Sequence, residues 1–511
     1  MPDGAVPDAN VSWWISSTSA NSYPSLPAEG VEADVAVLGA GIAGLTTAYA
    51  LAREGRSVVV VEAGRIAEGV SGYTTAKVTV GHSLIYADLT DRFDAATARG
   101  YAQSQHEALA WLCDTVEREG LDCDLERVPK LVYTEVVEER DTIEGEVEAA
   151  VAAELPASLV TTSDLPYPIV AGVRYDDQAQ FHPRRYLLGL AERFVALGGR
   201  IFEQNRALDV DSGQPCVVHT EQGEVRAAEV VVATHYPFLD RGLLFARLAA
   251  YRDVVVAFDI AADADPGVMA ISDGTEQGGT HSVRTAPYSG GRRLLIVTGG
   301  QFKTGQSSTV EDEYATLTAW AQDRFGVGEP VHRWSTQDAS SVDRMPYIGR
   351  LPLSGDHVWV ATGFSAWGMT GGTMAGLLLT DLLQGRENEW GALYDPSRKD
   401  VRASAAKLVQ ENLNVAKELI SGQLRADVDG ADDLAPGHAG IYRGPDGRTA
   451  AYRDTAGALH AVSARCTHLG CTVRFNDAEK SWDCPCHGSR FGVDGSVLAG
   501  PAVVPLEEVQ P

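Results

Sequence analysis

The sequence predicts a chain in three parts: an α/β domain, an α+β domain inserted into it, and a small all-β domain at the C-terminus. Its 511 residues are enough for about three domains and a large core. A strand, a glycine-rich turn, a helix and a second strand follow one another in residues 34–62. Amphipathic helices and alternating strands occupy much of 91–334, and short Cys/His motifs mark 437–511. These three observations predict the fold class.

The α/β domain begins with a complete βαβ unit. Buried strands are predicted at Asp34–Leu38 and Ser57–Val61, with a helix at Leu45–Glu54 between them. The turn Gly39–Gly44 has the sequence that lets a pyrophosphate approach a helix N-terminus. Glu62 ends the second strand, where an acid accepts from ribose hydroxyls. An ordinary tight βα turn is the alternative, but the register of the whole unit favours dinucleotide binding.

Further segments indicate which dinucleotide is bound. Glu62–Arg65 and Ser71–Lys77 resemble the ribose acid and the flavin loop of the D-amino-acid-oxidase and glycerol-phosphate-dehydrogenase superfamily of FAD enzymes. Asp343–Gly349 and the turn Gly363–Thr370 resemble the superfamily segment that places backbone amides against the flavin pyrimidine edge. The resemblance implies a Rossmann-like FAD domain. The FAD contacts implied in this sequence are Gly39, Gly41, Ile42, Ala43, Gly44, Glu62, Ala63, Arg65, Thr75, Ala76, Lys77, Ala207, Ala233, Gly363, Trp367, Gly368, Met369 and Thr370.

The residues expected to act in catalysis are Lys77, Arg284 and Trp367. Lys77 matches a Ser/Thr-x-Lys element of the superfamily, Arg284 is expected to clamp a carboxylate or phosphate, and Trp367 to wall the substrate pocket. A solvated lysine, a surface ion pair and simple core packing are the respective alternatives. The same presumed antiparallel sheet also carries His281, Tyr288 and Lys303.

The expected domain boundaries are discontinuous, because the FAD motifs are separated along the chain. The expected segments are an N-terminal arm at 1–30, an FAD domain at 31–90, 168–235 and 335–390, a substrate-capping domain at 91–167 and 236–334, a helical connector at 391–436, and a terminal domain at 437–511.

The terminal domain contains two short ligand motifs. Cys466-Thr-His468 and Cys484-Pro-Cys-His487 supply two Cys and two His, with fifteen residues from Leu469 to Asp483 between them. This set suits a [2Fe-2S] cluster held by Cys on one iron and His on the other, while a tetrahedral zinc site is the alternative. The motifs resemble a Rieske centre of the cytochrome bc type. That resemblance implies metal ligands at Cys466, His468, Cys484 and His487, and a disulfide between Cys471 and Cys486.

One position departs from the high-potential members of the Rieske family. They have a Tyr whose hydroxyl donates to a ligand sulfur, where this chain has Phe491; the Ser that donates to a bridging sulfide is kept as Ser489. Hydrogen bonds to the sulfurs raise the potential. The resemblance therefore implies an intermediate potential within the Rieske range of about −150 to +300 mV.

Composition excludes some classes of partner. With 42 basic against 70 acidic residues, the formal charge is −28, which argues against nucleic-acid binding. No run of eighteen apolar residues and no basic leader occur, so we expect a cytoplasmic protein without a membrane span. Cys113, Cys123 and Cys216 are scattered and form no extracellular disulfide framework.

No second glycine-rich βαβ unit follows Thr90, unlike in flavoenzymes that also bind a pyridine nucleotide. We therefore expect an FAD-dependent dehydrogenase that oxidises a small amine, amino acid or hydroxy compound. Electrons would leave through the Rieske cluster to an external acceptor, a protein or a quinone-like molecule. The alternative is an electron-transfer reductase that supplies an oxygenase or cytochrome; a redox sensor with a vestigial flavin site is a third interpretation.

Overall fold

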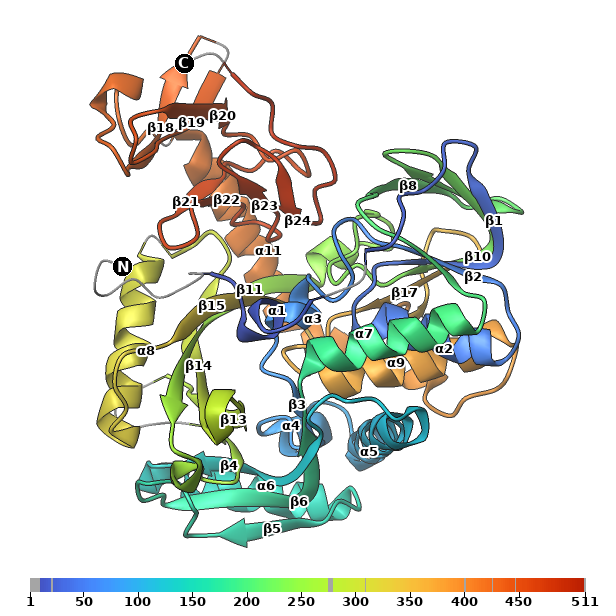
Figure 1. Ribbon diagram of the computed structural model, residues 1–511, viewed down its shortest axis with the longest axis vertical. Coiled ribbons are helices and arrows are strands. Elements are labelled where there is room, and N and C mark those ends of the chain that lie inside the picture. The colour runs from blue at the N-terminus through green and yellow to red at the C-terminus, as the bar shows by residue number, and fades with distance from the viewer. Residues whose placement is uncertain are drawn as a thin grey trace.

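The computed structural model describes residues 10–19, 22–273, 279–307, 309–398, 401–424, 426–445 and 447–509. Figure 1 shows a large body and a smaller C-terminal domain, which lies at one end of the body beside helix α11. In the described part of the chain, no helix is both long and apolar enough to cross a membrane.

The first sheet forms the α/β core of the body. Leu38 of its central strand stands opposite Val61 on one side and Val232 on the other, in parallel register. The carboxyl ends of these strands therefore meet at one edge, where the glycine turn begins. The order is β16 (Tyr347–Arg350), β17 (Val358–Thr362), β10 (Glu224–Val232), β1 (Val31–Leu38), β2 (Val58–Val61) and β7 (Arg200–Phe202), and β8 (Ala207–Asp211) and β9 (Cys216–Thr220) extend it from β10.

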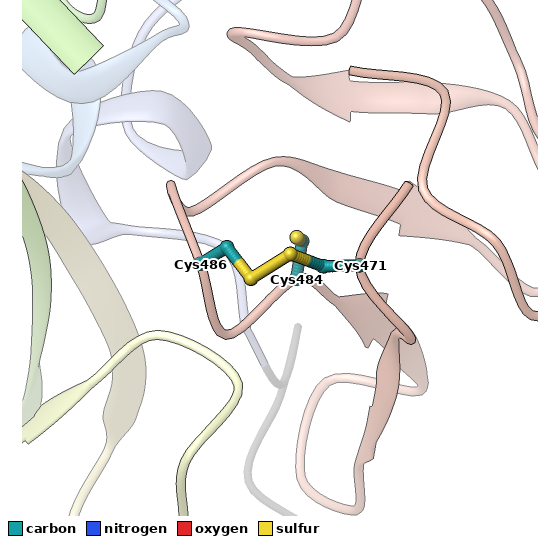
Figure 2. Close-up of side chains that lie close together, drawn as sticks. All are labelled: Cys471, Cys484 and Cys486. Atoms are coloured by element: carbon teal, nitrogen blue, oxygen red, sulfur yellow. A yellow bond between two sulfur atoms is a disulfide. The ribbon is translucent and has the colours of Figure 1, made fainter. Parts of the chain in front are cut away.

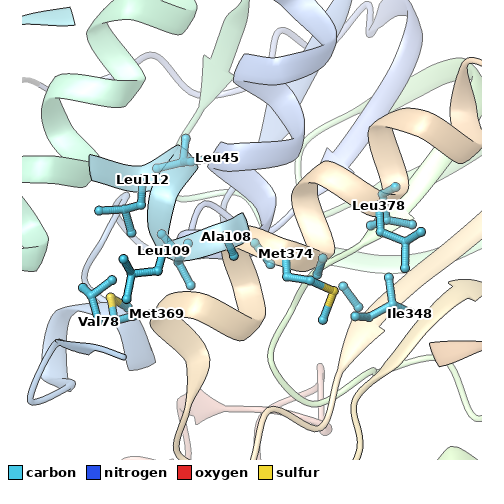
Figure 3. Packing of buried hydrophobic residues seen from close by; sticks show 14 of the residues in the cluster. Leu45, Val78, Ala108, Leu109, Leu112, Ile348, Met369, Met374 and Leu378 are labelled. Carbon is cyan, nitrogen blue, oxygen red and sulfur yellow. The ribbon is translucent and has the colours of Figure 1, made fainter. Parts of the chain in front are cut away.

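Helices pack on this sheet and on one another. They are α2 (Ile42–Arg53), α5 (Ala95–Glu119), α7 (Pro183–Ala196) and α9 (Gly368–Leu383). Figure 3 shows Leu45 of α2, Leu109 of α5 and Met374 of α9 in one hydrophobic core. A Cβ at Gly376 would lie 2.6 Å from Thr46 Cγ2, so this glycine allows α9 to approach α2 closely.

The second sheet is larger and mostly antiparallel. Its order is β15 (His332–Ser341), β11 (Leu248–Ile260), β14 (Arg293–Lys303), β13 (Ser282–Pro287), β12 (Met269–Ser272), β4 (Glu126–Thr134), β6 (Ala171–Gln180) and β3 (Lys77–Val78), with β5 (Ala157–Val160) beside β6. Helix α6 (Arg140–Ala152) packs on β5 and β6, and α8 (Val310–Phe325) on β11 and β14. The short helix α4 (Ile85–Arg92) lies against α5 and α6.

The sheet pairing differs from the expected domain boundaries at three strands. β3, β6 and most of β15 fall in segments expected for the FAD domain, but they pair with strands of the second sheet. In the chain, β6 is followed by α7 and β15 by β16, so these two strands lead from the second sheet back to the first sheet and its helices. A strand joins a sheet through backbone hydrogen bonds. The pattern of its side chains shows that it is a strand but not which sheet it joins.

Several helices of the body agree with the prediction, but no helix was predicted at α8. The sequence pattern also predicts helices at Ala95–Glu119 and from about Gly372 to Leu383. The first is α5 with the same bounds, whereas α9, like α2, begins earlier than predicted, inside its glycine turn. Within the connector the sequence predicts a helix from about Pro396 to Leu424. The observed helix is α11 (Val401–Leu424), and residues 399–400 lie outside the described part of the chain. The N-terminal arm contains a helical turn, α1 (Trp13–Ser16), and two further short helices are α3 (Val70–Tyr73) and α10 (Gly391–Tyr394).

The C-terminal domain consists of small antiparallel sheets. One pairs β18 (Ala439–Gly444), β19 (Gly447–Arg453) and β20 (Leu459–Ser463), and another pairs β21 (Arg474–Asn476), β22 (Ser481–Asp483), β23 (Arg490–Gly492) and β24 (Val497–Ala499). Val415 and Leu419 of α11 pack on its core, while Asn412 of the same helix donates to the Ala246 carbonyl of the body (3.0 Å). Helix α11 thus contacts both parts.

Candidate active site and metal centre

A cavity of about 1250 Å³ lies at the carboxyl edge of the first sheet. Pockets for a single small ligand are usually about 300–1000 Å³, so this one has room for a large cofactor and a substrate. The predicted FAD contacts in its wall are Gly39, Gly41, Ile42, Ala43, Glu62, Ala63, Arg65, Thr75, Lys77, Ala207, Ala233, Trp367, Gly368 and Met369.

The glycine turn is shaped by close backbone contacts. Gly39 has φ of +102°, and a Cβ there would lie 2.6 Å from the Ala233 carbonyl oxygen. At Gly44 a Cβ would lie 1.9 Å from the Gly39 carbonyl oxygen, so only glycine fits. The N-cap of α2 is Gly41, which offers no side chain to its amides, and the first turn faces the cavity. This helix N-terminus fits a pyrophosphate.

Glu62 is held in place by backbone amides. One carboxylate oxygen accepts from Ala40 N (2.8 Å) and the other from Gly64 N (2.9 Å). These bonds fix its orientation in the cavity wall, and each oxygen keeps a further lone pair that a ribose hydroxyl can use.

The loop Gly72–Ala76 is held by side chains from distant segments. Ser12 Oγ donates to the first carbonyl of the loop (2.5 Å), Trp334 Nε1 to the second (2.9 Å) and Trp14 Nε1 to the third (2.6 Å). Two of these donors belong to the N-terminal arm, and Trp14 is fully buried. The arm therefore anchors the loop that the superfamily resemblance places beneath the flavin.

Arg284 has a different role from the predicted substrate clamp. Its side chain is 1% exposed, and Nη1 donates to the carbonyls of Thr75 (2.9 Å), Ala76 (2.8 Å) and Phe181 (3.2 Å). It lies outside the cavity wall. The prediction is corrected because these backbone carbonyls use the guanidinium donors that a carboxylate would need.

Lys77, predicted to contact FAD and act in catalysis, lines the cavity. Its side chain is buried, and Nζ lies 3.3 Å from Thr75 Oγ1. Burial, and then the nearby Arg284 charge, lower the pKa of Lys77 to about 7. The amine can therefore hold or release a proton near neutral pH.

Trp367 both walls the cavity and packs against buried polar groups. Its ring stacks on His82 at 4.6 Å, and His82 bonds to Tyr101 Oη (2.6 Å) and the Thr79 carbonyl (2.7 Å). Lys130 Nζ lies 5.5 Å from the Trp367 ring, and we find no hydrogen-bond partner for it among the described residues. Burial holds the pKa of Lys130 far below its usual value. Sequence analysis missed Lys130, although a lysine inside the apolar strand β4 was a usable signal.

Several other predicted residues lie behind the wall or elsewhere. Gly44 and Ala76 are in the backbone beneath it, Gly363 packs near Leu248, and Thr370 Oγ1 donates to the Thr79 carbonyl (3.2 Å). On the second sheet His281 lines the cavity and stacks on Trp320, whereas Tyr288 packs on Trp13 and Lys303 pairs with Glu411.

The cysteine pair of the C-terminal domain is buried between its two loops. Cys466 N donates to the Cys471 carbonyl (2.8 Å), and Cys484 N donates to the Ser489 carbonyl (2.8 Å). The Cys484 thiol donates to the Cys466 sulfur, which lowers the pKa of Cys466, and the Ser489 hydroxyl adds a second bond to that sulfur. Ser489 Oγ also accepts from Ala502 N (3.0 Å).

The two histidines complete a set of ligand atoms. The rings of His468 and His487 lie 5.0 Å apart and nearly perpendicular. In each ring Nδ1 is buried and bonded to none of the residues described in the structure. Such an atom is costly to bury unless a metal occupies it. Two thiols and two free imidazole nitrogens fit a [2Fe-2S] cluster with Cys on one iron and His on the other.

The remaining cysteines of the two loops form the predicted disulfide. Figure 2 shows Cys471 bonded to Cys486, with Cys484 beside them. Their sulfurs come within 4.8 Å of one another, but the disulfide removes Cys471 and Cys486 as metal ligands. Phe491 is fully buried in the same core and offers no hydroxyl to a sulfur.

Comparison with known families decides the identity. The FAD dependent oxidoreductase family matches residues 34–382, and the Rieske [2Fe-2S] domain matches residues 425–510. This chain is an FAD-dependent oxidoreductase with a Rieske domain. The Rieske-fused oxidoreductase therefore binds FAD in its larger part and a [2Fe-2S] cluster in its smaller one.

Individual proteins share one or both parts of the Rieske-fused oxidoreductase. The putative Rieske 2Fe-2S iron-sulfur protein YhfW of Bacillus subtilis is 35% identical over 506 residues, covering 98% of each chain. Gamma-glutamylputrescine oxidoreductase of Escherichia coli is 24% identical and covers 73% of this chain and 89% of its own length. Glycine oxidase from Geobacillus kaustophilus has the same fold, with a TM-score of 0.58 at 21% identity, over 72% of this chain and 99% of its own.

Proposed function

We propose that this oxidoreductase oxidises a small amine, amino acid or hydroxy compound and passes the electrons through the Rieske domain to an external acceptor. When bound, FAD would accept a hydride and the cluster would carry electrons one at a time.

The shared wall of the large cavity carries this proposal. Gly39 and Glu62 of the first sheet line it, as do Asp253 and Gln301 of the second sheet. The Rieske domain contributes Val497, Leu498, Ala499, Gly500, Ala502 and Val503. The FAD site, the substrate-facing sheet and the electron-transfer domain thus border one space. This arrangement supports substrate oxidation and electron exit within a single chain.

We assign the cofactor contacts as follows. The first turn of α2 and Glu62 would hold the pyrophosphate and ribose of FAD, as the helix N-terminus at the cavity and the remaining acceptor capacity of Glu62 indicate. Cys466 and Cys484 would hold one iron, and His468 and His487 the other, through the two buried Nδ1 atoms.

The carboxylates on and beside the second sheet support an amine as the substrate, although Arg65, Arg206 and Arg344 also line the cavity. Asp253, Asp338 and Glu313 line the cavity, and burial raises the pKa of Asp253 to about 7, so a bound cation would favour its charged form. Arg284, the expected carboxylate clamp, is committed to the backbone. Gamma-glutamylputrescine oxidoreductase is a relative whose name also indicates an amine. Neutral Lys77 would accept the proton that an ammonium substrate must lose before oxidation.

An anaerobic substrate panel tests this function, with flavin and cluster absorbance followed separately. We expect an amine to bleach the flavin first and the cluster next, while NADH bleaches neither. In a Cys484→Ser variant, the flavin should still bleach and the Rieske electron-spin-resonance signal should be absent. Prompt bleaching by NADH, with no response to amines, amino acids or polyol phosphates, would instead indicate the electron-transfer reductase.

A further inference from the structure

A loop of the flavin-binding part reaches the histidines of the Rieske domain. Asp240, between β10 and β11, has its Oδ1 2.8 Å from His468 Nε2, although the two residues are 228 positions apart. Phe245 of the same loop meets the His487 ring edge-on at 5.7 Å. Each proposed histidine ligand therefore has a neighbour that the other part of the molecule supplies.

The contact fixes the tautomer of His468. Its Nδ1 is buried with no partner in the described part of the structure, and it is the atom left for iron. Nε2 must then carry the hydrogen and donate it to the Asp240 carboxylate. A metal-ligating histidine that donates its second N–H to a carboxylate is held in one orientation and is a more basic ligand.

We propose that Asp240 is a positioning residue for the Rieske cluster: it orients His468 and lowers the midpoint potential of the cluster. The carboxylate places a negative charge beside the ligand, and this charge stabilises the oxidised cluster relative to the reduced one. A residue of the flavin-binding part thereby adjusts the midpoint potential of the cluster that would receive the flavin electrons. This inference depends on the cluster and its ligands, and is independent of which substrate is oxidised.

Docking of the Rieske domain keeps this contact in place. Gln337 Nε2 of β15 donates to the Gly488 carbonyl in the second ligand loop (3.0 Å). A Cβ at Gly488 would lie 2.3 Å from Ala250 Cβ, so the loop lies directly against the second sheet. The side chain of His468 is only 5% exposed. Asp240 thus acts on a histidine that the interface covers.

The test is a redox titration of the cluster, monitored by electron-spin resonance at fixed pH in full-length protein loaded with FAD and iron. Asp240→Asn removes the charge and keeps the shape. We expect the midpoint potential of the cluster to rise, with a three- to tenfold shift of its one-electron reduction equilibrium toward the reduced form. A tenfold shift corresponds to about 59 mV. Asp240→Glu should restore part of the difference. Asp494→Asn, the same charge change at a carboxylate that bonds to Ser496, is the matched control.

The outcomes separate a tuning role from a structural one. An unchanged or lowered midpoint in Asp240→Asn, or an equal rise in the Asp494→Asn control, would overturn the proposal. Loss of the cluster from Asp240→Asn but not from Asp240→Glu would support it, because only the carboxylate distinguishes the variants. Loss from both would overturn it. Iron content, FAD content and g-values are measured on each protein, and none of these readouts requires a substrate.

Discussion

At the scale of single residues, two buried lysines lie at or near the large cavity. Lys77 faces the cavity and Lys130 lies behind Trp367, and burial lowers the pKa of both. Each ammonium would lack the water that normally stabilises it. A neutral lysine is a proton acceptor, which suits the chemistry proposed for Lys77.

The titration of Lys77 predicts a pH-dependent stability. Below about pH 7 the folded and the unfolded protein both hold the Lys77 proton. The cost of burying the charged amine then lowers the free energy of unfolding by its full amount. Above that pH the folded protein has released the proton while the unfolded chain still holds it, so stability rises with pH. Relative to Lys77→Met, we expect the wild-type free energy of unfolding to rise by up to about 1.4 kcal/mol per pH unit between pH 7 and 9. Urea unfolding measures this.

The exposed Lys480 provides the control for that series. Its amine donates to the Asp477 carbonyl at the surface of the Rieske domain. Lys480→Met should follow the wild type at every pH. A constant difference between wild type and Lys77→Met across the range would contradict the assigned titration.

The N-terminal arm and the flavin loop form the element on which the cavity depends. Arg284 and the indole of Trp14 hold successive carbonyls of the loop Gly72–Ala76, and the Arg284 guanidinium lies 5.3 Å from the Trp14 ring. Thr75 and Lys77 project from or next to this loop into the cavity. The arm therefore contributes to the FAD site without lining it.

Trp14→Phe tests the role of the arm. The change keeps most of the buried ring and removes the donor to the Thr74 carbonyl, which costs about 1–3 kcal/mol for a buried group left unpaired. We expect weaker FAD binding, by several-fold or more, with a loss of stability of that size. Fluorescence titration of the apoprotein with FAD measures the affinity.

Trp13→Phe is the matched comparison on the same helix. Trp13 packs on Tyr288 and His332, and among the described residues its indole donates to no carbonyl of the loop. Its FAD affinity should stay near that of the wild type. Equal losses in the two variants would show that ring packing, and not the hydrogen bond, is what matters.

An ionic network joins the Rieske domain to the rest of the molecule. Arg252 of β11 pairs with Glu479 of the Rieske domain, and Glu479 also pairs with Arg490. Arg490 in turn lies 3.0 Å from Asp483, just before the proposed ligand Cys484. Arg252 is 1% exposed, and Glu479 and Arg490 are mostly buried, so this network lies largely inside the interface. It holds the cluster loops at a fixed position against the second sheet.

Removing the Glu479 carboxylate should lower the stability of the protein, because it is the centre of the network between the Rieske domain and the second sheet. Burial alone would raise the pKa of Glu479, but Arg252 and Arg490 outweigh it and lower the pKa to about 2. Its contribution is therefore present above about pH 4 and is lost as the pH falls toward 2. We expect Glu479→Gln to lower the free energy of unfolding by about 3–5 kcal/mol at pH 7, because it leaves Arg252 buried and unpaired. The difference should shrink with acid.

Glu311→Gln serves as the reference for that measurement. Glu311 makes a two-bond pair with Arg333, but its side chain is 44% exposed. Surface pairs contribute roughly 0–1 kcal/mol. Denaturant curves followed by flavin and cluster signals should show a much smaller loss. Similar losses in the two variants would mean that burial does not strengthen the interface network.

Local patterns in the sequence determined the cofactors of this protein. Gly39–Gly44 and Glu62 belong to one βαβ unit, and each Cys/His motif is a short local sequence, so their chemistry can be read without the fold. The disulfide between Cys471 and Cys486 followed from the resemblance to Rieske domains, and the structure contains it.

Only the tertiary structure decided how those sites are supported and joined. Arg284 left the predicted substrate site because the carbonyls of a segment about two hundred positions away take its donors. Lys130 and Asp240 gained roles through neighbours equally distant in the chain. The physical reason is that a hydrogen bond or a charge acts over a few ångströms, and folding chooses which distant residues come that close.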